Sequence, residues 1–305
     1  MNVDYPIIYE IACKTYAVNE FGMSSFFILV GTERGLVIDC GCGSFRARNL
    51  VEQLCPLPYD VVITHAHGEH CGGMGFWEKV WIHPDDMEAA RDVDQLLDRL
   101  YQNRAIWESP QERGTLFPLY SGEKWTYPAY NLGARDFYSF KHINFLGLEQ
   151  LPEFLPLKDG QIFDLGGGRI ISTLHLPGHS EGHCVFIDSK ERILFSGDAC
   201  SSNLSVRSCS LNTTLKSLLK LREHRSEFDR NFCSHTACGS DTAGFSLPPF
   251  VLDDCIEACR NVLNCTLFSG NGHLVYRSVC LIYDPGRLLD EGELPVFETP
   301  LKDLQ

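Results

Sequence analysis

The sequence lacks clusters of positive charge and long apolar runs. Its 305 residues include 26 lysines and arginines against 40 aspartates and glutamates, which gives a formal net charge of −14. Nucleic acids and anionic membrane surfaces bind proteins through clustered positive charge, so neither is expected as a partner. No segment stays apolar over the roughly 20 residues needed to cross a bilayer, and a membrane span is therefore not expected.

Signals for secretion and for zinc knuckles are also missing. The opening MNVDYPIIYEIACKTYAV has no basic stretch followed by an apolar one, so it does not resemble a signal peptide. The 14 cysteines are scattered rather than arranged in CxxC pairs. Both observations favour a cytoplasmic location, where buried cysteine serves as a small hydrophobic residue instead of forming disulfides.

Motifs of covalent catalysis and of phosphate binding are absent as well. The sequence contains no GxSxG and no Cys/His pairing that would require a covalent route. The glycines of DLGGGR are not followed by a helix carrying GK[ST]. We therefore interpret them as a hairpin turn rather than a phosphate-binding loop.

The sequence does contain an alternation of strand and helix patterns. Strands are predicted within residues 7–39, 59–67, 80–83, 161–179, 183–200, 228–235 and 272–284. Helices are predicted at residues 44–55, with Ser44 as a cap candidate, from Pro84 to about 105, at 213–224 and at 248–264. This order predicts an α/β sandwich with sheets inside and helices outside, in a single domain over residues 1–305.

Residues 105–156 have a different composition. They are rich in tryptophan, tyrosine, phenylalanine and proline and show no clean period. We interpret them as an insertion of short helices and loops within the domain. Their role stays open between filling a local core, forming a lid that gives the active site an apolar wall, and forming a dimer interface.

A dense group of metal-binding side chains follows a short apolar strand. The segment VVITHAHGEHCGG places His65, His67, Glu69 and His70 within six residues. Neutral imidazole nitrogens and an anionic carboxylate at this density are what a divalent metal requires. The group lies past the C-terminal end of its strand, where open sheets place their ligands.

Three later segments offer the rest of a ligand set. Each places one candidate after a strand, namely His179 in LPGHSEGH, Asp198 in ILFSGDAC and His235 in NFCSHTACG. If these strand ends meet at one rim, two metals can be held. The candidate ligands of the first metal are His65, His67 and His179. The candidate ligands of the second are Glu69, His70 and His235. Asp198 would reach both metals, and each would keep an open position for water.

Four motifs in this order, THAHGEHCGG, LPGHSEGH, LFSGD and SHTACG, resemble the HxHxDH, His, Asp and His signature of the metallo-β-lactamase superfamily. The resemblance covers about residues 7–283, apart from the insertion. It implies an αββα sandwich of two mixed β-sheets with outer helices and a dinuclear zinc site at the edge between the sheets. It also implies that Asp39, in LVIDCG, orients the ligand loop rather than binding a metal.

One position departs from that signature. Glu69 stands where the family has aspartate, and a glutamate side chain reaches about 1.5 Å further. Glu69 could still bind the second metal, or it could act as a nearby base. The second site is therefore less secure than the first, and a single ion, or iron or manganese in place of zinc, stays open.

Other histidines and cysteines near these motifs receive structural interpretations. We interpret His175 as part of a polar network, His183 as a residue behind the ligands, and His83 as a loop or helix-cap residue. Cys71 directly follows His70 and Cys200 lies two residues after Asp198. For both cysteines, burial as a structural thiol is favoured over metal binding.

The expected reaction is metal-dependent hydrolysis of a small-molecule ester, thioester or lactone. A metal-bound hydroxide attacks the carbonyl, and the metal stabilises the developing oxyanion. Glu69 or Asp198 orients the nucleophile and transfers a proton to the leaving group. The aromatic insertion and a loose resemblance to thioesterase-like and hydroxyacylglutathione-hydrolase-like members favour this substrate class.

Other chemistries on the same fold stay open. A mononuclear-iron oxidoreductase of the sulfur-dioxygenase type is the main alternative, because imidazole suits iron as well as zinc. Phosphodiesterases, β-lactamase-like hydrolases and a metal-dependent scaffold without catalysis are further alternatives. The oligomeric state is open between a monomer and a homodimer.

Overall fold

The structure of the protein is a computed structural model. It describes residues 6–20, 23–108, 119–120, 125–126, 144–235, 246–267 and 270–293. Most of the insertion predicted at residues 105–156 lies outside the described residues, and so does its predicted role as a lid or interface.

The N-terminal half forms a seven-stranded mixed sheet. Its strands, in spatial order, are β1 (Ile7–Ala12), β2 (Thr15–Glu20), β3 (Ser24–Val30), β4 (Gly35–Ile38), β5 (Tyr59–Val62), β6 (Lys79–Ile82) and β9 (Glu153–Pro156). The strands from β1 to β4 pair antiparallel, and β4, β5, β6 and β9 pair parallel. Helix α1 (Ala47–Leu54) makes the crossover between β4 and β5 that parallel neighbours require.

A five-stranded sheet follows in the second half. Its strands, in spatial order, are β10 (Ile162–Asp164), β11 (Ile170–His175), β12 (Cys184–Asp188), β13 (Ile193–Gly197) and β15 (Arg230–Cys233). A tight turn at residues 189–192 joins β12 to β13, where Asp188 pairs with Ile193. The last two strands pair parallel, and helix α6 (Leu211–Glu223) lies between them in the chain.

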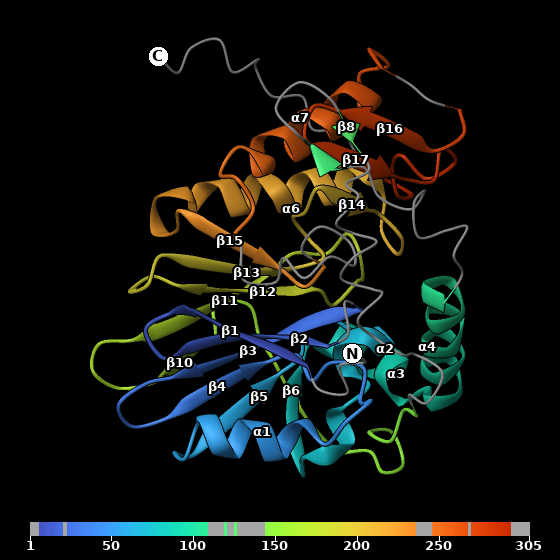
Figure 1. Ribbon diagram of the computed structural model, residues 1–305. Coiled ribbons are helices and arrows are strands. Elements are labelled where there is room, and N and C mark those ends of the chain that lie inside the picture. The colour runs from blue at the N-terminus through green and yellow to red at the C-terminus, as the bar shows by residue number, and fades with distance from the viewer. Residues whose placement is uncertain are drawn as a thin grey trace.

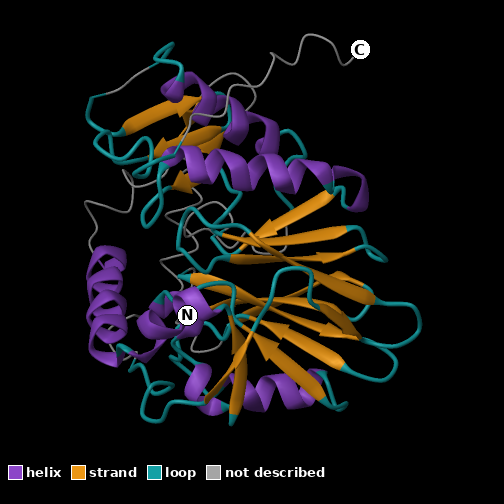
Figure 2. Cartoon of the chain, turned by 180° about the vertical axis from the view of Figure 1, so that it is seen from behind, coloured by secondary structure: helices purple, strands orange, loops and turns teal. Residues whose placement is uncertain are grey.

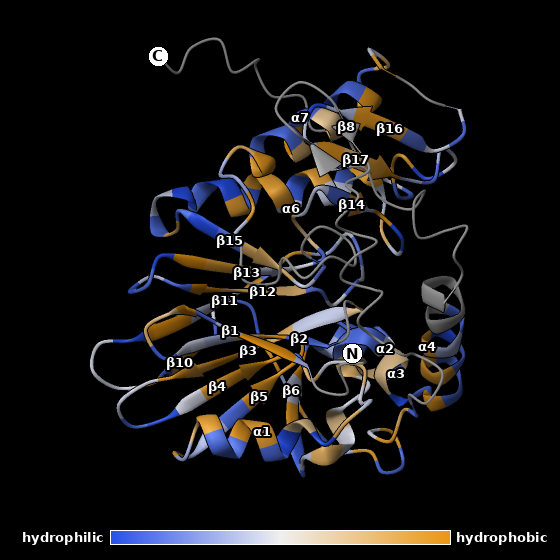
Figure 3. Cartoon of the chain, in the orientation of Figure 1, coloured by the Kyte–Doolittle hydropathy of each residue, from blue (hydrophilic) through white to orange (hydrophobic). Residues whose placement is uncertain are grey.

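The two sheets stack face to face, and helices cover their outer faces (Figure 1). Helix α1 lies outside the seven-stranded sheet, while α6 and α7 (Val251–Leu263) lie outside the five-stranded sheet. Between the sheets, the ring of Phe27 lies 4.9 Å from that of Phe195 and 6.4 Å from that of Phe232, measured between centroids. Hydrophobic residues are concentrated in the strands of both sheets (Figure 3). The predicted αββα sandwich is confirmed.

A three-stranded sheet extends this four-layer plan. Its order is β14 (Asn203–Ser205), β17 (Val279–Ile282) and β16 (His273–Tyr276). The strand pattern at residues 272–284 therefore forms a hairpin that pairs with β14 instead of with either large sheet. Helix α7 packs between α6 and this hairpin. Its buried Asp254 accepts a hydrogen bond from the Ser278 hydroxyl at 2.6 Å and fixes the hairpin to the helix.

Both ends of the predicted insertion belong to regular elements. Helix α4 (Val93–Glu108) continues past residue 105 along one side of the sandwich (Figure 2). At the other end, β9 pairs with β6 and packs Phe154 against the core. A run that ends in proline is a poor central strand, but β9 lies at the sheet edge, where Pro156 is tolerated. The remaining short elements are α2 (Gly68–Cys71), η1 (Met74–Phe76), η2 (Pro84–Asp86), α3 (Met87–Arg91), η4 (Arg225–Glu227), β7 (Leu119–Tyr120) and β8 (Trp125–Thr126).

The predicted cap of α1 is wrong. The helix has Arg46 at its N-cap, without a side-chain hydrogen bond. Ser44 instead donates from its backbone N–H at 2.9 Å, and from its hydroxyl, to the buried carboxylate of Glu20. Burial raises the pKa of Glu20, although Ser44 and Cys42 donate hydrogen bonds to it. The Ser44 hydroxyl bonds to Glu20 rather than capping α1. A buried carboxylate without hydrogen-bond donors costs more free energy than a helix end whose N–H groups can bond to water.

The described part of the chain bears on the expectations for membrane spans and cysteines. No helix there is both long enough and apolar enough to cross a membrane. Each described cysteine has a free thiol. Cys71 and Cys200 are fully buried, as their structural interpretation predicts, and burial raises the pKa of the Cys71 thiol well above its usual value.

A buried arginine joins the two large sheets. Arg169, in the turn before β11, donates from Nε to Asp188 of β12 at 2.8 Å. Its Nη1 donates to the carbonyl of Val30 on β3 at 3.1 Å, and its Nη2 donates to the hydroxyl of Thr15 on β2 at 2.6 Å. Arg169 and Asp188 are both buried. The pair with Asp188 fixes the guanidinium group, and its bonds to Val30 and Thr15 join the two sheets.

Replacing Arg169 by methionine should lower the free energy of unfolding by about 3–5 kcal/mol, because Asp188 would be left as an unpaired buried charge. The measurement is chemical denaturation followed by circular dichroism. The matched control is Arg34→Met, which breaks an exposed ion pair with Asp60 at 2.8 Å and should change stability by about 0–1 kcal/mol. Equal effects of the two substitutions would contradict a structural role for the buried pair.

Candidate metal centre

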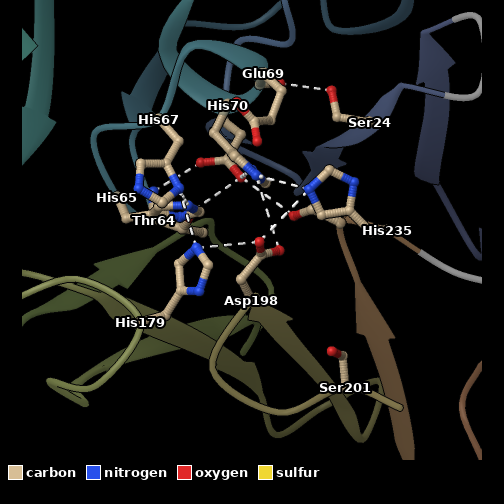
Figure 4. A network of polar contacts seen from close by, with 12 residues as sticks. Ser24, Thr64, His65, His67, Glu69, His70, His179, Asp198, Ser201 and His235 are labelled. Atoms are coloured by element: carbon tan, nitrogen blue, oxygen red, sulfur yellow. Dashed lines mark hydrogen bonds and ion pairs between the residues drawn. The ribbon is translucent and has the colours of Figure 1, made fainter. Parts of the chain in front are cut away.

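The candidate ligands from distant segments meet at one end of the stacked sheets (Figure 4). The loop after β5 contributes His65 and His67, and the short helix α2 that follows it contributes Glu69 and His70. The loops that follow β11, β13 and β15 of the five-stranded sheet contribute His179, Asp198 and His235. The strands that carry them point their C-terminal ends to this rim, which is where open sheets place binding sites.

Three imidazoles form the first cluster. Nδ1 of His67 lies 2.9 Å from Nε2 of His65 and 3.0 Å from Nε2 of His179. Nitrogens bound at about 2.0–2.1 Å around a tetrahedral zinc ion are roughly 3.3 Å apart. The three nitrogens therefore converge almost as closely as zinc ligands do. His65 and His179 are buried and His67 is partly exposed, so the cluster opens to solvent on the His67 side.

A second cluster lies beside the first. Nε2 of His70 lies 3.2 Å from Nε2 of His235, and the Glu69 carboxylate lies within 4.8 Å of both. Asp198 stands between the clusters. Its Oδ2 lies 3.3 Å from Nε2 of His179 and 3.5 Å from Nε2 of His235. One carboxylate thus contacts both groups of imidazoles, as a ligand shared by two cations would.

The outer nitrogens of three imidazoles are held by fixed partners. Nδ1 of His65 lies 3.0 Å from the Thr64 hydroxyl, and Nδ1 of His179 lies 2.6 Å from the Ser205 carbonyl. Nδ1 of His70 lies 3.1 Å from Oδ2 of Asp39. These contacts turn the Nε2 atoms toward the centre, which is how outer partners orient metal-binding histidines.

Asp39 lies behind the ligand loop. Its carboxylate accepts hydrogen bonds from the Thr64 N–H at 2.7 Å and the Thr64 hydroxyl at 2.9 Å, in addition to its contact with His70. The backbone of Asp39 has a φ of +66°, in the left-handed region that most residues avoid. This conformation ends β4 abruptly and points the carboxylate at the loop after β5.

Burial keeps the first cluster neutral. It lowers the pKa of His65 and His67 well below the usual value, and neighbouring positive charges lower both further. Burial also lowers the pKa of His179, to about 4, although Asp198 acts in the opposite direction. Neutral imidazoles offer free lone pairs, which is the form that binds a metal.

The second cluster concentrates negative charge. Burial would raise the pKa of Asp198, but His235, His70 and His179 lower it well below its usual value. Burial would likewise lower the pKa of His70, but Asp198 and Asp39 raise it to about 9. The carboxylates therefore stay ionised in a buried setting that favours a bound cation.

The buried carboxylate of Glu69 is also suited to a bound cation. Its Oε2 is buried and has no hydrogen-bond donor, while the Nε of Arg99 lies 3.8 Å away. Burial would raise the pKa of Glu69, but His70, Arg99 and His235 lower it. A buried, ionised oxygen without a donor is costly, and a cation between Glu69, His70 and His235 would satisfy it. The residues present therefore fit a divalent metal.

Gly197 allows Asp198 to reach the site. Its φ is +51°, and a Cβ atom there would lie 2.8 Å from Nε2 of His183. The same Nε2 accepts a hydrogen bond from the backbone N–H of Asp198 at 3.1 Å. Only glycine fits this close approach, and the ring of His183 lies behind Asp198 and holds its backbone N–H.

His83 and His175 lie outside the two clusters. His83 caps η2 by accepting a hydrogen bond from the Asp85 N–H at 3.3 Å, as predicted. Its ring stacks on that of His175 at 3.8 Å between centroids, and Nε2 of His175 lies 2.8 Å from the Glu181 carbonyl. His175 therefore belongs to a polar network at the edge of the sheets.

Asp86 is a positioning residue that the sequence did not reveal. Its carboxylate accepts from the Ala66 N–H at 3.0 Å, within the His65–His67 segment. It also accepts from the Ser180 hydroxyl and from the Gly182 N–H, both at 2.7 Å, in the loop that carries His179. One buried carboxylate thus fixes both loops of the first cluster. In the sequence, Asp85 and Asp86 both look like favourable first-turn residues.

Replacing Asp86 by alanine should lower kcat/KM for the hydrolysis expected from the sequence by about 10–100-fold. Loss of a residue that orients metal-binding side chains typically lowers activity by about that factor. The free energy of unfolding should fall by about 1–3 kcal/mol, since buried donors lose their acceptor. Steady-state kinetics and denaturation measure the two effects. The neighbouring Asp85→Ala is the control, because Asp85 is exposed and should leave kcat/KM within twofold. Loss of stability without loss of rate would reject a positioning role.

Comparisons with known proteins identify the family of the chain. A family model for the metallo-beta-lactamase superfamily matches residues 19–223. The acyl-coenzyme A thioesterase MBLAC2 of Homo sapiens is 26% identical over 187 residues, which cover 57% of this chain and 57% of that protein. The atrochrysone carboxyl ACP thioesterase nsrC of Aspergillus novofumigatus is 24% identical over 207 residues, which cover 67% of this chain and 46% of that protein. The chain spans about half the length of these curated relatives.

Solved structures share the fold at low sequence identity. The DIM-1 metallo-beta-lactamase superposes with a TM-score of 0.51 and 12% identity, covering 86% of this chain and 100% of that one. At this identity the likeness concerns the fold alone.

Proposed function

Because the chain belongs to the metallo-beta-lactamase superfamily, we propose that it is a metal-dependent hydrolase of small-molecule thioesters. The observation that carries the proposal is the convergence of five histidines and two carboxylates at one rim of the sheets. The buried, donor-free Oε2 of Glu69 supports a cation at that place. The thioester class is supported by the relatives, two of which are named thioesterases.

Zinc is the proposed metal, with two ions as the proposed number. The residues that would hold the first are His65, His67 and His179. The residues that would hold the second are Glu69, His70 and His235, with Asp198 between the two. When bound, zinc supplies Lewis acidity toward a carbonyl and lowers the pKa of water. The nitrogen and oxygen donors also suit iron or manganese, so the metal identity needs direct measurement.

Asp198 is the carboxylate of the site that is placed to contact an attacking water. Asp198 is held ionised and is accessible to solvent over 14% of its side chain. It can therefore orient an attacking water and take its proton. A thiol ionises at a pKa of about 8.5, so a thiolate leaves near neutral pH without first being protonated, whereas an alkoxide needs an acid. A site whose carboxylates are ionised thus favours thioesters over simple esters.

The decisive experiment combines elemental analysis of the purified chain with a substrate panel. The panel contains an acyl-coenzyme A thioester, a lactone, a phosphodiester and a β-lactam. We expect zinc in the protein and hydrolysis of the thioester at the highest kcat/KM. Turnover of another class without any thioester hydrolysis would overturn the proposed substrate. Bound iron together with oxygen consumption would favour the oxidoreductase instead.

Replacing Glu69 by aspartate tests the second metal site. The substitution restores the residue of the family signature but withdraws the carboxylate by about 1.5 Å. Because Glu69 already lies within ligand distance of His70 and His235, we expect the affinity for the second ion to fall at least about tenfold, equivalent to 1.4 kcal/mol. Zinc titration with a chromophoric chelator measures it. An unchanged stoichiometry and rate would show that the glutamate is a neutral variation.

A further inference from the structure

Two arginines that the proposed chemistry does not use lie beside the clusters. Nε of Arg99, on helix α4, lies 3.8 Å from Oε2 of Glu69 in the second cluster. Arg207 follows β14 and donates from Nε to the Ser205 hydroxyl at 3.0 Å. The Ser205 carbonyl in turn contacts Nδ1 of His179 at 2.6 Å. One guanidinium group therefore lies next to each cluster, and the two come from separate elements of the fold (Figure 1).

These arginines are not used in ordinary structural ion pairs. Within the described part of the chain, Arg207 has no carboxylate partner, and its contact is the neutral Ser205 hydroxyl. The partner of Arg99 is Glu69, which is itself a proposed metal ligand. A guanidinium group carries five N–H donors. Among the described residues, the contacts of Arg99 and Arg207 leave most of these donors available.

The charges at the rim indicate what kind of ligand the two arginines could bind. With two divalent cations bound, the cations and the two guanidinium groups would carry six positive charges, while Asp39, Glu69, Asp86 and Asp198 would carry four negative charges. The rim would therefore be positive on a chain whose formal net charge is −14. Burial lowers the pKa of Arg207, and the nearby charge of Arg99 lowers it further. Cations grouped in this way repel one another unless an anion joins them.

We infer that Arg99 and Arg207 bind a carboxylate of the substrate that lies close to the scissile thioester. The inference rests on the proposed function for the reacting bond and adds the chemical class of substrate. Arginine suits this task because its planar donors match a carboxylate in a bidentate way.

The position of the arginines limits where that carboxylate sits. Both contact residues of the clusters or their immediate partners, so the anion must be only a few bonds from the reacting carbonyl. It belongs either to a short dicarboxylic acyl group or to the part of the thiol carrier next to sulfur. The phosphates of coenzyme A lie at the far end of the pantetheine arm and would be too distant.

Matched thioesters distinguish the two sources. For the acyl side, succinyl-N-acetylcysteamine is compared with its methyl ester. For the thiol side, butyryl-N-acetylcysteine is compared with butyryl-N-acetylcysteamine. For one of these two pairs, we expect the zinc-loaded wild-type chain to hydrolyse the carboxylated thioester with a kcat/KM at least tenfold higher than that of its uncharged counterpart. Arg207→Gln and Arg99→Gln should each reduce that preference to below threefold, mainly through KM.

Direct binding measurements test this inference without requiring that any thioester is hydrolysed. Calorimetric titration of the zinc-loaded chain compares succinate with its monomethyl ester, and N-acetyl-S-methylcysteine with N-acetyl-S-methylcysteamine. A preference of the wild type for the more carboxylated member of one pair, which both variants reduce, supports the arginine pair, even if no thioester is hydrolysed. Absence of hydrolysis would overturn the proposed function alone.

The control and the contrary outcomes are specific. Arg34→Gln makes the same change in an exposed ion pair at the start of β4, at the opposite end of the strand from the site, and should keep the wild-type preference. If neither probe pair shows a preference, or if the variants weaken charged and uncharged members equally, the inference is wrong. Zinc content and circular dichroism of each variant identify any loss of folding. If one arginine variant does not fold, the preference measured in the other variant decides the outcome.

Discussion

Replacing His67 by alanine should reduce kcat/KM for a thioester by about 10³-fold, which corresponds to roughly 4 kcal/mol of lost transition-state stabilisation. His67 is central to the first cluster, because its Nδ1 lies within 3.0 Å of both His65 and His179. The side chain is partly exposed, so its removal should leave the core and the secondary structure intact. The measurements are kcat/KM, zinc per chain and the far-ultraviolet circular dichroism spectrum.

A second histidine provides the control for this variant. His224 caps the C-terminal end of α6 and pairs with Glu227 at 2.7 Å, away from the clusters. His224→Ala should keep both the rate and the zinc content. Activity that survives in His67→Ala together with complete loss of metal would show that the reaction does not depend on the proposed centre.

Replacing Asp198 by asparagine should lower kcat/KM by about 10²–10⁴-fold, the range for loss of a group that moves a proton in the transition state. Asparagine keeps the shape of the side chain and the backbone hydrogen bond to His183 at 3.1 Å. It removes the negative charge that lies 3.3 Å from His179 and 3.5 Å from His235. We therefore expect the rate to fall while the fold is retained, with fewer zinc ions bound per chain.

The same substitution at a distant aspartate tests whether charge alone explains the effect. Asp229 forms an exposed ion pair with Arg192 at 2.8 Å. Asp229→Asn should leave kcat/KM within twofold of the wild type. A wild-type rate in Asp198→Asn would remove Asp198 from the mechanism and leave Glu69 as the candidate base.

The ligand segments and the sandwich could be predicted because their signals are local. His65, His67 and His70 stand within one short stretch, and each later candidate follows a recognisable strand. Strand and helix patterns depend on nearby residues, and short motifs at strand ends are visible without knowledge of the contacts. The family resemblance then supplied the order of the layers.

What could not be predicted depends on contacts between distant segments. Asp86 differs from its neighbour Asp85 only because tertiary packing turns its side chain toward Ala66 and Gly182. Ser44 has the sequence of a helix cap, but the buried carboxylate of Glu20 competes for it. The pairing of β14 with β17 joins residues far apart in the chain, which no local pattern specifies.

The ligand candidates are divided between the two sheets, and this division links metal supply to folding. One half of the chain brings His65 and His67 while the other brings His179, so a bound ion would add a further connection between halves that packing, Arg169 and Asp86 already join. In newly made chains that bind no metal, the contact between the two halves should consequently be less stable. The abundance of active protein in a cell would then follow its metal reserves as well as its rate of synthesis.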